Sequence, residues 1–436
     1  MERQIEVRRS KALLVAGLLS AAVYLVLAGR LSWWRYGGTL QSWAKLLGED
    51  RATCGICLGG IGILMALYLW GLRSVRSGSV ERRTIWAFAF TFAAVLLWLL
   101  PITSDLFAYL SQAYMLTDLG ANPLLQAPLD FQDPLLLSYS TVYAARPSVY
   151  GPAWVLLSAI GTVGPHDVPV GLFYLKGLAA VAYLGSAWLV ERILLEFRPK
   201  VALEGLYLFA WSPLVLLMAV GDGHNDMVMM ALVLLATWLL LKERLVVAFG
   251  VLALSVWIKY VSLALLPLFG LYAWRRLGQE QGTDLLRPMT HGGLAVVLVS
   301  LVVVAPLGRI EGLLGIAQRL LRPMNWRGAA AGTPTLVLGI GLFLFLLAYV
   351  FLLVRALQGS GSFQQLMNVS FLALLLAFLL GAARSQPWHL LWPAALAGLS
   401  DYRWAVPVIV GLSGIMLAVQ VGVEWAVPSF AFLVVE

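Results

Sequence analysis

The chain has 436 residues, of which 61% are hydrophobic and only 12% are charged. A composition this apolar excludes an ordinary soluble globular protein. The formal net charge of +8 does not indicate nucleic-acid binding, because basic loops that face anionic lipid explain it in a membrane protein. Apolar segments of about 15–23 residues recur from end to end, and they lack the polar–apolar alternation of β-barrel strands. We therefore predict an all-α, polytopic transmembrane protein.

About 13 membrane-spanning helices are predicted along the chain. The first follows Arg8, Arg9 and Lys11 and lacks a small-residue cleavage site before Arg30, so we interpret it as a retained span. Several segments are short, and 245–274 has a second interpretation as one long broken helix. The predicted spans lie near residues 12–29, 53–72, 84–101, 168–190, 201–220, 227–241, 245–258, 261–274, 291–306, 335–354, 366–382, 388–399 and 404–421.

The segment 151–164 decides on which side of the membrane the loops lie. As a span it would place the basic stretch 192–200 outside, whereas an interfacial or re-entrant helix leaves that stretch inside, as the positive-inside rule favours. We adopt the second interpretation, which puts the N-terminus and most of the 30 Lys and Arg residues in the cytoplasm. The segment 102–167 then becomes a long first outer loop that contains interfacial helices, in a multi-pass protein of the plasma membrane.

Asp105 follows the third predicted span, four residues after Pro101, at the start of this outer loop. A charged side chain at the bilayer centre costs roughly 2.5–3.5 kcal/mol, so a carboxylate at this position indicates a site at the membrane surface. The alternative is a solvated acid at a helix end, or the N-cap of the next helix.

Other polar residues that hydropathy does not explain fall on the same predicted side of the membrane. A short turn crowds Asp222, His224, Asn225 and Asp226 together, although polar loop composition alone is the simpler explanation for most loop residues. Asp222, His224 and Asp226 lack further acidic or histidine partners at convincing spacing, so we expect no metal site. The remaining candidates for binding the donor or acceptor are Tyr150, Lys259, Arg319, Arg322, Arg384, Gln386, Trp388 and His389.

These residue types suit the transfer of a sugar from a lipid-phosphate donor. A carboxylate accepts the proton of an attacking hydroxyl, Lys and Arg stabilise a phosphate leaving group, and Trp and Tyr stack on a sugar face. Lys259 has a second interpretation as a lysine that snorkels from an apolar helix, as does Lys176, to which we assign no role. The rival function is a multi-span transporter or a flippase for lipid-linked saccharides, which would place ionisable groups near the midplane on broken, repeated helices.

Six motifs, taken in order, resemble those of the bacterial polyprenyl-phosphate-mannose-dependent α-mannosyltransferases, which belong to the GT-C superfamily. They are Ser-Asp-Leu-Phe-Ala-Tyr at 104–109, Gly-Ala-Asn-Pro at 120–123, Tyr-Gly-Pro at 150–152, Gly-His-Asn-Asp at 223–226, Trp-Ile-Lys at 257–259 and Gln-Pro-Trp-His-Leu-Leu-Trp at 386–392. The resemblance implies a GT-C fold, an inverting transfer without a metal ion or other cofactor, and Asp105 as the general base. It also implies a polyprenyl-phosphate sugar as donor and a glycan or glycolipid as acceptor.

Three features depart from the family's pattern. Ser104 stands where relatives often carry Arg or Asp, His389 replaces a frequent Tyr, and two spans precede the one that leads to Asp105. We expect a single integral membrane domain over 1–436, because no soluble segment is long enough to fold alone. Its parts are two N-terminal spans in 1–83, a GT-C-like core with the catalytic outer loop in 84–274, and spans that complete the donor site in 275–436.

Overall fold

The structure is a computed structural model that describes residues 2–36, 50–77, 80–139, 144–162, 168–280, 286–307, 335–381 and 385–426. Within these ranges the regular structure is helical, apart from an isolated antiparallel bridge between Ser32 and Leu99. This confirms the predicted all-α fold class. The chain forms two compact units, each built from segments that are distant in sequence. The predicted boundaries within a single membrane domain stay a prediction.

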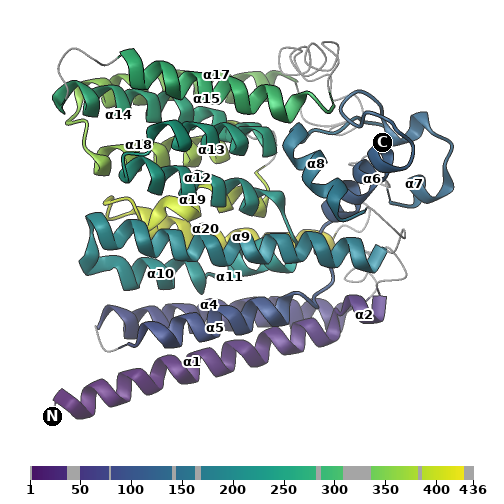
Figure 1. Ribbon diagram of the computed structural model, residues 1–436. Coiled ribbons are helices and arrows are strands. Elements are labelled where there is room, and N and C mark those ends of the chain that lie inside the picture. The colour runs from purple at the N-terminus through teal and green to yellow at the C-terminus, as the bar shows by residue number, and fades with distance from the viewer. Residues whose placement is uncertain are drawn as a thin grey trace. The chain divides into compact units, whose positions relative to one another are not determined.

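The first unit comprises Met1–Leu106, Leu172–Met227 and Gln386–Ala431. Its helices are α1 (Glu2–Arg30), α2 (Trp33–Tyr36), α4 (Arg51–Arg76), α5 (Arg82–Leu96), α9 (Val168–Phe197), α10 (Ala202–Ala210), α11 (Pro213–Val215), α19 (Leu391–Ala397) and α20 (Ala405–Ala426), with the 3₁₀ turns η3 (Pro199–Val201) and η7 (Pro387–Leu390) and the π-helical turn η4 (Leu216–Gly221). Helices α1, α4 and α5 lie side by side (Figure 1). Gly17 permits this close approach, because a Cβ atom there would lie 2.4 Å from the Phe88 ring.

The second unit comprises Phe107–Gly171 and Val228–Ser385 among the described residues. Its helices are α6 (Asp105–Thr117), α7 (Pro134–Tyr139), α8 (Pro152–Ile160), α12 (Asn225–Leu241), α13 (Leu245–Ile258), α14 (Leu265–Glu280), α15 (Leu286–Val304), α17 (Thr335–Gln358) and α18 (Phe363–Leu376), with the 3₁₀ turns η2 (Pro128–Asp130) and η5 (Tyr260–Ala264) and the π-helical turn η6 (Ala377–Gly381). The first residues of α6 and α12 belong to the first unit. Helices α13 and α15 pack along each other, and α14, α17 and α18 form a second group (Figure 1).

Seven helices of the described chain are long and apolar enough to cross a membrane. An eighth span is present if Pro199–Ala210 and Pro213–Gly221, which are bent by 45°, form one broken span. These helices confirm a polytopic membrane protein. They match the predicted spans 12–29, 53–72, 168–190, 201–220, 291–306, 335–354, 366–382 and 404–421.

The predicted count of 13 spans is not confirmed. Helices α5, α12, α13 and α14 have 15, 17, 14 and 16 residues, whereas a helix with a rise of about 1.5 Å per residue needs about 20 residues to cross the hydrocarbon core. The predicted span 388–399 is divided between the four residues of η7 and the seven of α19. The segment 245–274 forms two helices joined by the short turn η5.

The segment 102–167 contains the short helices α6, α7 and α8, in agreement with the predicted loop. Helix α8, in the segment 151–164 that decided the topology, has 9 residues. At about 1.5 Å per residue it is less than half as long as a bilayer core of about 30 Å is thick. It is therefore too short to be a span.

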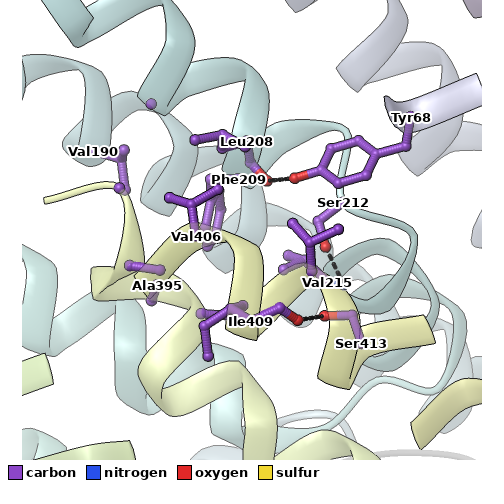
Figure 2. A pocket seen from close by; sticks show the side chains of 15 residues that line it. Tyr68, Val190, Leu208, Phe209, Ser212, Val215, Ala395, Val406, Ile409 and Ser413 are labelled. Carbon is purple, nitrogen blue, oxygen red and sulfur yellow. Dashed lines mark hydrogen bonds between the residues drawn. The ribbon is translucent and has the colours of Figure 1, made fainter. Parts of the chain in front are cut away.

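The break between α10 and α11 directs the chain toward the turn at 221–226. Pro213 has no N–H with which to continue the helix, and the Oγ of Ser212 accepts a hydrogen bond from the N–H of Val215 at 3.4 Å. Beneath the break lies a cavity of about 20 Å³, which is room for about one water molecule. Figure 2 shows its lining, in which the Tyr68 hydroxyl donates to the Leu208 carbonyl at 2.7 Å.

The residues that follow α5 are held in place by backbone hydrogen bonds to the residues that follow α1. The N–H of Leu100 donates to the carbonyl of Leu31 at 2.7 Å, and the N–H of Trp33 donates to the carbonyl of Trp98 at 3.3 Å. These bonds fix the residues that lead from α5 to Asp105. Asp105 is the first residue of α6. It therefore begins its helix directly after a constrained segment.

Candidate active site

The turn Gly-Asp-Gly-His-Asn-Asp follows η4 and leads into α12. Its central residue, Gly223, has a φ of +74°, a conformation that L side chains rarely adopt. A Cβ atom at this position would also lie 2.7 Å from a methyl group of Leu106. Glycine is therefore required for both the conformation and the space. The turn directs Asp222 and His224 into one buried cluster of the first unit.

Asp222 is the hydrogen-bond acceptor at the centre of this cluster. Its Oδ1 accepts the N–H of Thr103 at 2.8 Å, and its Oδ2 accepts the Thr103 hydroxyl at 3.1 Å. The Nε2 of His224 lies 2.7 Å from the same Oδ2. Asp222 and His224 are both fully buried. The interaction joins the segment before α6 to the turn before α12, although 119 positions separate Thr103 from Asp222.

The other ring nitrogen of His224 lies beside the predicted base. Its Nδ1 is 3.5 Å from the Oδ2 of Asp105 and 4.0 Å from the Oδ2 of Asp226. Asp105 is only 3% exposed, which rules out the alternative of a solvated acid at a helix end. Three carboxylates thus surround a single imidazole.

The charge state of His224 follows from two opposing effects. Burial alone would lower the pKa of His224, because it disfavours the charged imidazolium. Attraction and a hydrogen bond from Asp222, followed by attraction from Asp105 and Asp226, outweigh this effect and raise the pKa of His224 above its ordinary value of 6.5. The carboxylates therefore favour the charged imidazolium over the neutral ring.

The motif at 386–392 supplies the aromatic wall of the cluster. The ring of Trp388 stacks on that of His224 with centroids 4.3 Å apart. The indole N–H of Trp392 donates to the Oδ1 of Asp226 at 2.5 Å. His389 stacks on Trp392 at 4.6 Å, and the N–H of Gln386 lies 3.4 Å from the Nδ1 of His389. The residues predicted at 386–389 thus lie in or beside the cluster.

Lys176 is a member of the cluster to which the sequence alone assigned no role. It is 1% exposed, and its ammonium group donates to the carbonyl of Leu99. Its Cγ would lie 3.3 Å from a Cβ atom at Gly223, and it interacts electrostatically with Asp222. Lys176 therefore does not snorkel to the surface. A lysine in the middle of an apolar helix was a usable signal, but its partners lie in other segments.

A second group of predicted residues meets within the second unit. The ammonium of Lys259 lies 5.9 Å from the centroid of the Tyr150 ring, and this ring contacts Tyr109 edge-on at 4.9 Å. The N–H of Gly151 donates to the carbonyl of Ile258 at 3.1 Å. A Cβ atom at Gly151 would lie 1.9 Å from the Trp257 carbonyl oxygen. The motifs Tyr-Gly-Pro and Trp-Ile-Lys are thus in direct contact, and only glycine fits between them.

Asn225, the first residue of α12, is fully buried, and both polar atoms of its side-chain amide lack a hydrogen-bond partner among the described residues. A buried amide without partners is costly unless a ligand or water satisfies it. Arg319, Arg322 and Arg384 lie outside the described residues. Within the described ranges, no group of three or more His, Cys, Asp or Glu side chains has a geometry that suits a metal ion.

Comparison with known families decides what kind of protein carries this site. The family model described as "Alpha-(1->6)-mannopyranosyltransferase, N-terminal domain" matches residues 11–275, which is more than half of the chain. The chain belongs to this family. The match confirms the resemblance to GT-C mannosyltransferases and favours a glycosyltransferase over the rival transporter or flippase.

Three curated relatives extend the match. The chain is 25% identical over 408 residues to alpha-(1->6)-mannopyranosyltransferase A of Mycobacterium tuberculosis, an alignment that covers 88% of this chain and 76% of the relative. It is 28% identical over 188 residues to alpha-(1->6)-mannopyranosyltransferase A of Corynebacterium glutamicum, which covers 43% of this chain and 37% of the relative. It is also 28% identical over 197 residues to alpha-(1->6)-mannopyranosyltransferase B of Corynebacterium glutamicum, an alignment that covers 41% of this chain and 32% of the relative.

Proposed function

We propose that the protein transfers a mannosyl residue from a polyprenyl-phosphate donor to a glycan or glycolipid acceptor, with Asp105 as the general base. The observation that carries the proposal is the buried carboxylate of Asp105 beside His224, just after a segment that is hydrogen-bonded to the residues following α1. The names of the relatives support mannose as the sugar and an α-(1→6) linkage in the product. The donor and acceptor are substrates, and the reaction as proposed needs no metal ion.

The reaction forms one bond and breaks one. The acceptor hydroxyl oxygen attacks C1 of the mannosyl group, its proton passes to the carboxylate of Asp105, and the bond from C1 to the phosphate oxygen breaks. An alcohol is a weak nucleophile at neutral pH, so removal of its proton as the bond forms lowers the barrier. The lipid phosphate leaves with the electron pair and needs fixed positive charge nearby.

The other predicted site residues have complementary roles in this proposal. Lys259 supplies positive charge to the donor phosphate, together with Arg319, Arg322 or Arg384. The unpartnered amide of Asn225 suits a sugar hydroxyl, because it offers both a donor and an acceptor. Tyr150, Trp388 and His389 supply aromatic surface for the sugar, while Gln386 and Asp226 offer polar contacts at the same motifs.

A donor-selectivity assay tests the proposed function. Purified protein in detergent is expected to transfer mannose to an α-(1→6)-linked mannose oligosaccharide from polyprenyl-phosphate mannose and not from a nucleotide-linked mannose, since no nucleotide-binding motif is present. The product linkage is read by NMR. If the protein transfers mannose from the nucleotide sugar and not from polyprenyl-phosphate mannose, the proposed donor is wrong.

The same assay in sealed membrane vesicles tests on which side of the membrane transfer occurs. We place the reaction outside the cytoplasm, because the positive-inside rule puts the loop 102–167 on that side. An oligosaccharide that cannot cross the membrane should be extended by right-side-out vesicles that contain the lipid donor, and not by inverted vesicles. The reverse result would invert the proposed topology.

Removal of Lys259 tests the proposed phosphate contact. A hydrogen bond to a charged group is worth about 1.5–3 kcal/mol, so Lys259→Ala should lower kcat/KM for the lipid donor by roughly 10–100-fold. The exposed Lys242 offers a matched control, and Lys242→Ala should leave the kinetics unchanged. A folded Lys259→Ala protein with wild-type kinetics would return Lys259 to the role of a snorkelling residue.

A further inference from the structure

The cluster around His224 contains more negative than positive groups in a buried space. Asp222, Asp105 and Asp226 approach the imidazole from the turn, from α6 and from α12, while Trp388 of η7 covers one ring face. Among the described residues, Lys176 of α9 adds a further cation, whose ammonium group donates to the Leu99 carbonyl and interacts electrostatically with Asp222. A buried carboxylate is costly without an opposite charge or hydrogen-bond donors.

The hydrogen bonds of Asp222 decide the protonation of one ring nitrogen. Both oxygens of Asp222 accept hydrogen bonds from Thr103, and the Nε2 of His224 lies 2.7 Å from Oδ2. An ionised carboxylate has no proton to donate, so Nε2 carries a hydrogen. The other nitrogen, Nδ1, then faces the Oδ2 of Asp105 at 3.5 Å. This approach is attractive when Nδ1 is also protonated and repulsive when two lone pairs oppose each other.

In this geometry the Nε2 of His224 is bound to Asp222, and its Nδ1, which has no hydrogen-bond partner among the described residues, faces Asp105. Its side chain is fully buried, its nitrogens face carboxylates and its ring stacks on Trp388. A base that accepts a proton from an alcohol must first be ionised. A positive charge close to a carboxylate favours its ionised form.

We propose that His224 is a positioning residue whose imidazolium, held by Asp222 and Trp388, keeps Asp105 ionised and thereby sets the lower pH limit of transfer. The inference rests on the proposed role of Asp105 as general base. The raised pKa of His224 agrees with it, because the carboxylates around the ring favour its charged form.

The pH dependence of kcat in His224→Gln tests the inference. Glutamine keeps a polar side chain but cannot carry the charge, so Asp105 should ionise only at higher pH. An opposite charge within about 4–6 Å shifts such a titration by about 1–3 pH units. The acid limb of the profile should therefore move upward by that amount, with activity recovering at high pH and with KM for polyprenyl-phosphate mannose unchanged. His291→Gln, at an exposed histidine, should keep the wild-type profile.

Other outcomes separate this inference from its rivals. An unmoved acid limb would overturn it, and a raised donor KM with an unmoved limb would make His224 a ligand-binding residue. If Asp105→Asn is inactive while His224→Gln keeps the wild-type profile, this inference fails and the proposed function stands. If Asp105→Asn retains turnover, the base assignment itself fails.

A measurement on the wild-type protein covers the case in which His224→Gln does not fold. The chain has four histidines, so ¹⁵N-histidine labelling gives a simple NMR spectrum. One histidine should titrate above the ordinary histidine value of 6.5, and its midpoint should move in Asp105→Asn. Titration of all four histidines at or below 6.5 would overturn the inference.

Discussion

Asp105→Asn should lower kcat by about 10²–10⁴-fold, the contribution typical of a general base. Asparagine keeps the size of the side chain and most of its hydrogen-bonding capacity but cannot accept the acceptor's proton. Because the amide still fits beside His224, the protein should insert into the membrane, purify as a single species and bind the lipid donor. Single-turnover assays with polyprenyl-phosphate mannose measure the chemical step directly.

Two further variants make the Asp105 result specific. Asp118→Asn, at an exposed acid just beyond the end of α6, should keep wild-type turnover. Asp105→Ala should be no more active than Asp105→Asn. Near-normal turnover of Asp105→Asn would show that Asp105 is not the base, and Asp226 or Asp222 would become the candidate.

Asp222→Ala should have the largest effect on stability. Asp222 accepts two hydrogen bonds from Thr103 and pairs with His224 at 2.7 Å in a fully buried position. Removal of one partner from a buried ion pair costs about 3–5 kcal/mol, because the other charge stays buried without compensation. The variant should therefore unfold at a clearly lower temperature than the wild type. Asp401→Ala, at an exposed acid of the same unit, is the matched control and should unfold at the wild-type temperature.

The destabilisation by Asp222→Ala should also depend on pH. Because folding raises the pKa of His224 above 6.5, the stability of the charged pair is fully present below that ordinary value. It is lost as the pH rises through the higher pKa of the folded protein. The gap in thermal midpoint between wild type and Asp222→Ala should thus narrow between neutral and alkaline pH. A gap that is constant with pH would contradict an imidazolium in this cluster.

The candidate site was partly predictable from local sequence. Asp105 stands out because a carboxylate follows a run of apolar residues that ends at a proline, and Asp222, His224 and Asp226 stand out because polar residues crowd a short turn between apolar helices. For the motifs at 150–152 and 257–259, the sequence predicted only that both lie on the same side of the membrane. It did not predict that they are in direct contact. The roles of Arg319, Arg322 and Arg384 stay predictions.

The sequence by itself determined the all-α membrane class, most of the long spans and the identity of the turn residues, because hydropathy and turn chemistry are local properties of the chain. The packing of helices decided the rest. It buried Lys176 against the carbonyl of Leu99 and brought Thr103 to Asp222. These contacts join residues 77 and 119 positions apart, and only the tertiary structure fixes such distances and so places one imidazole between Asp222 and Asp105.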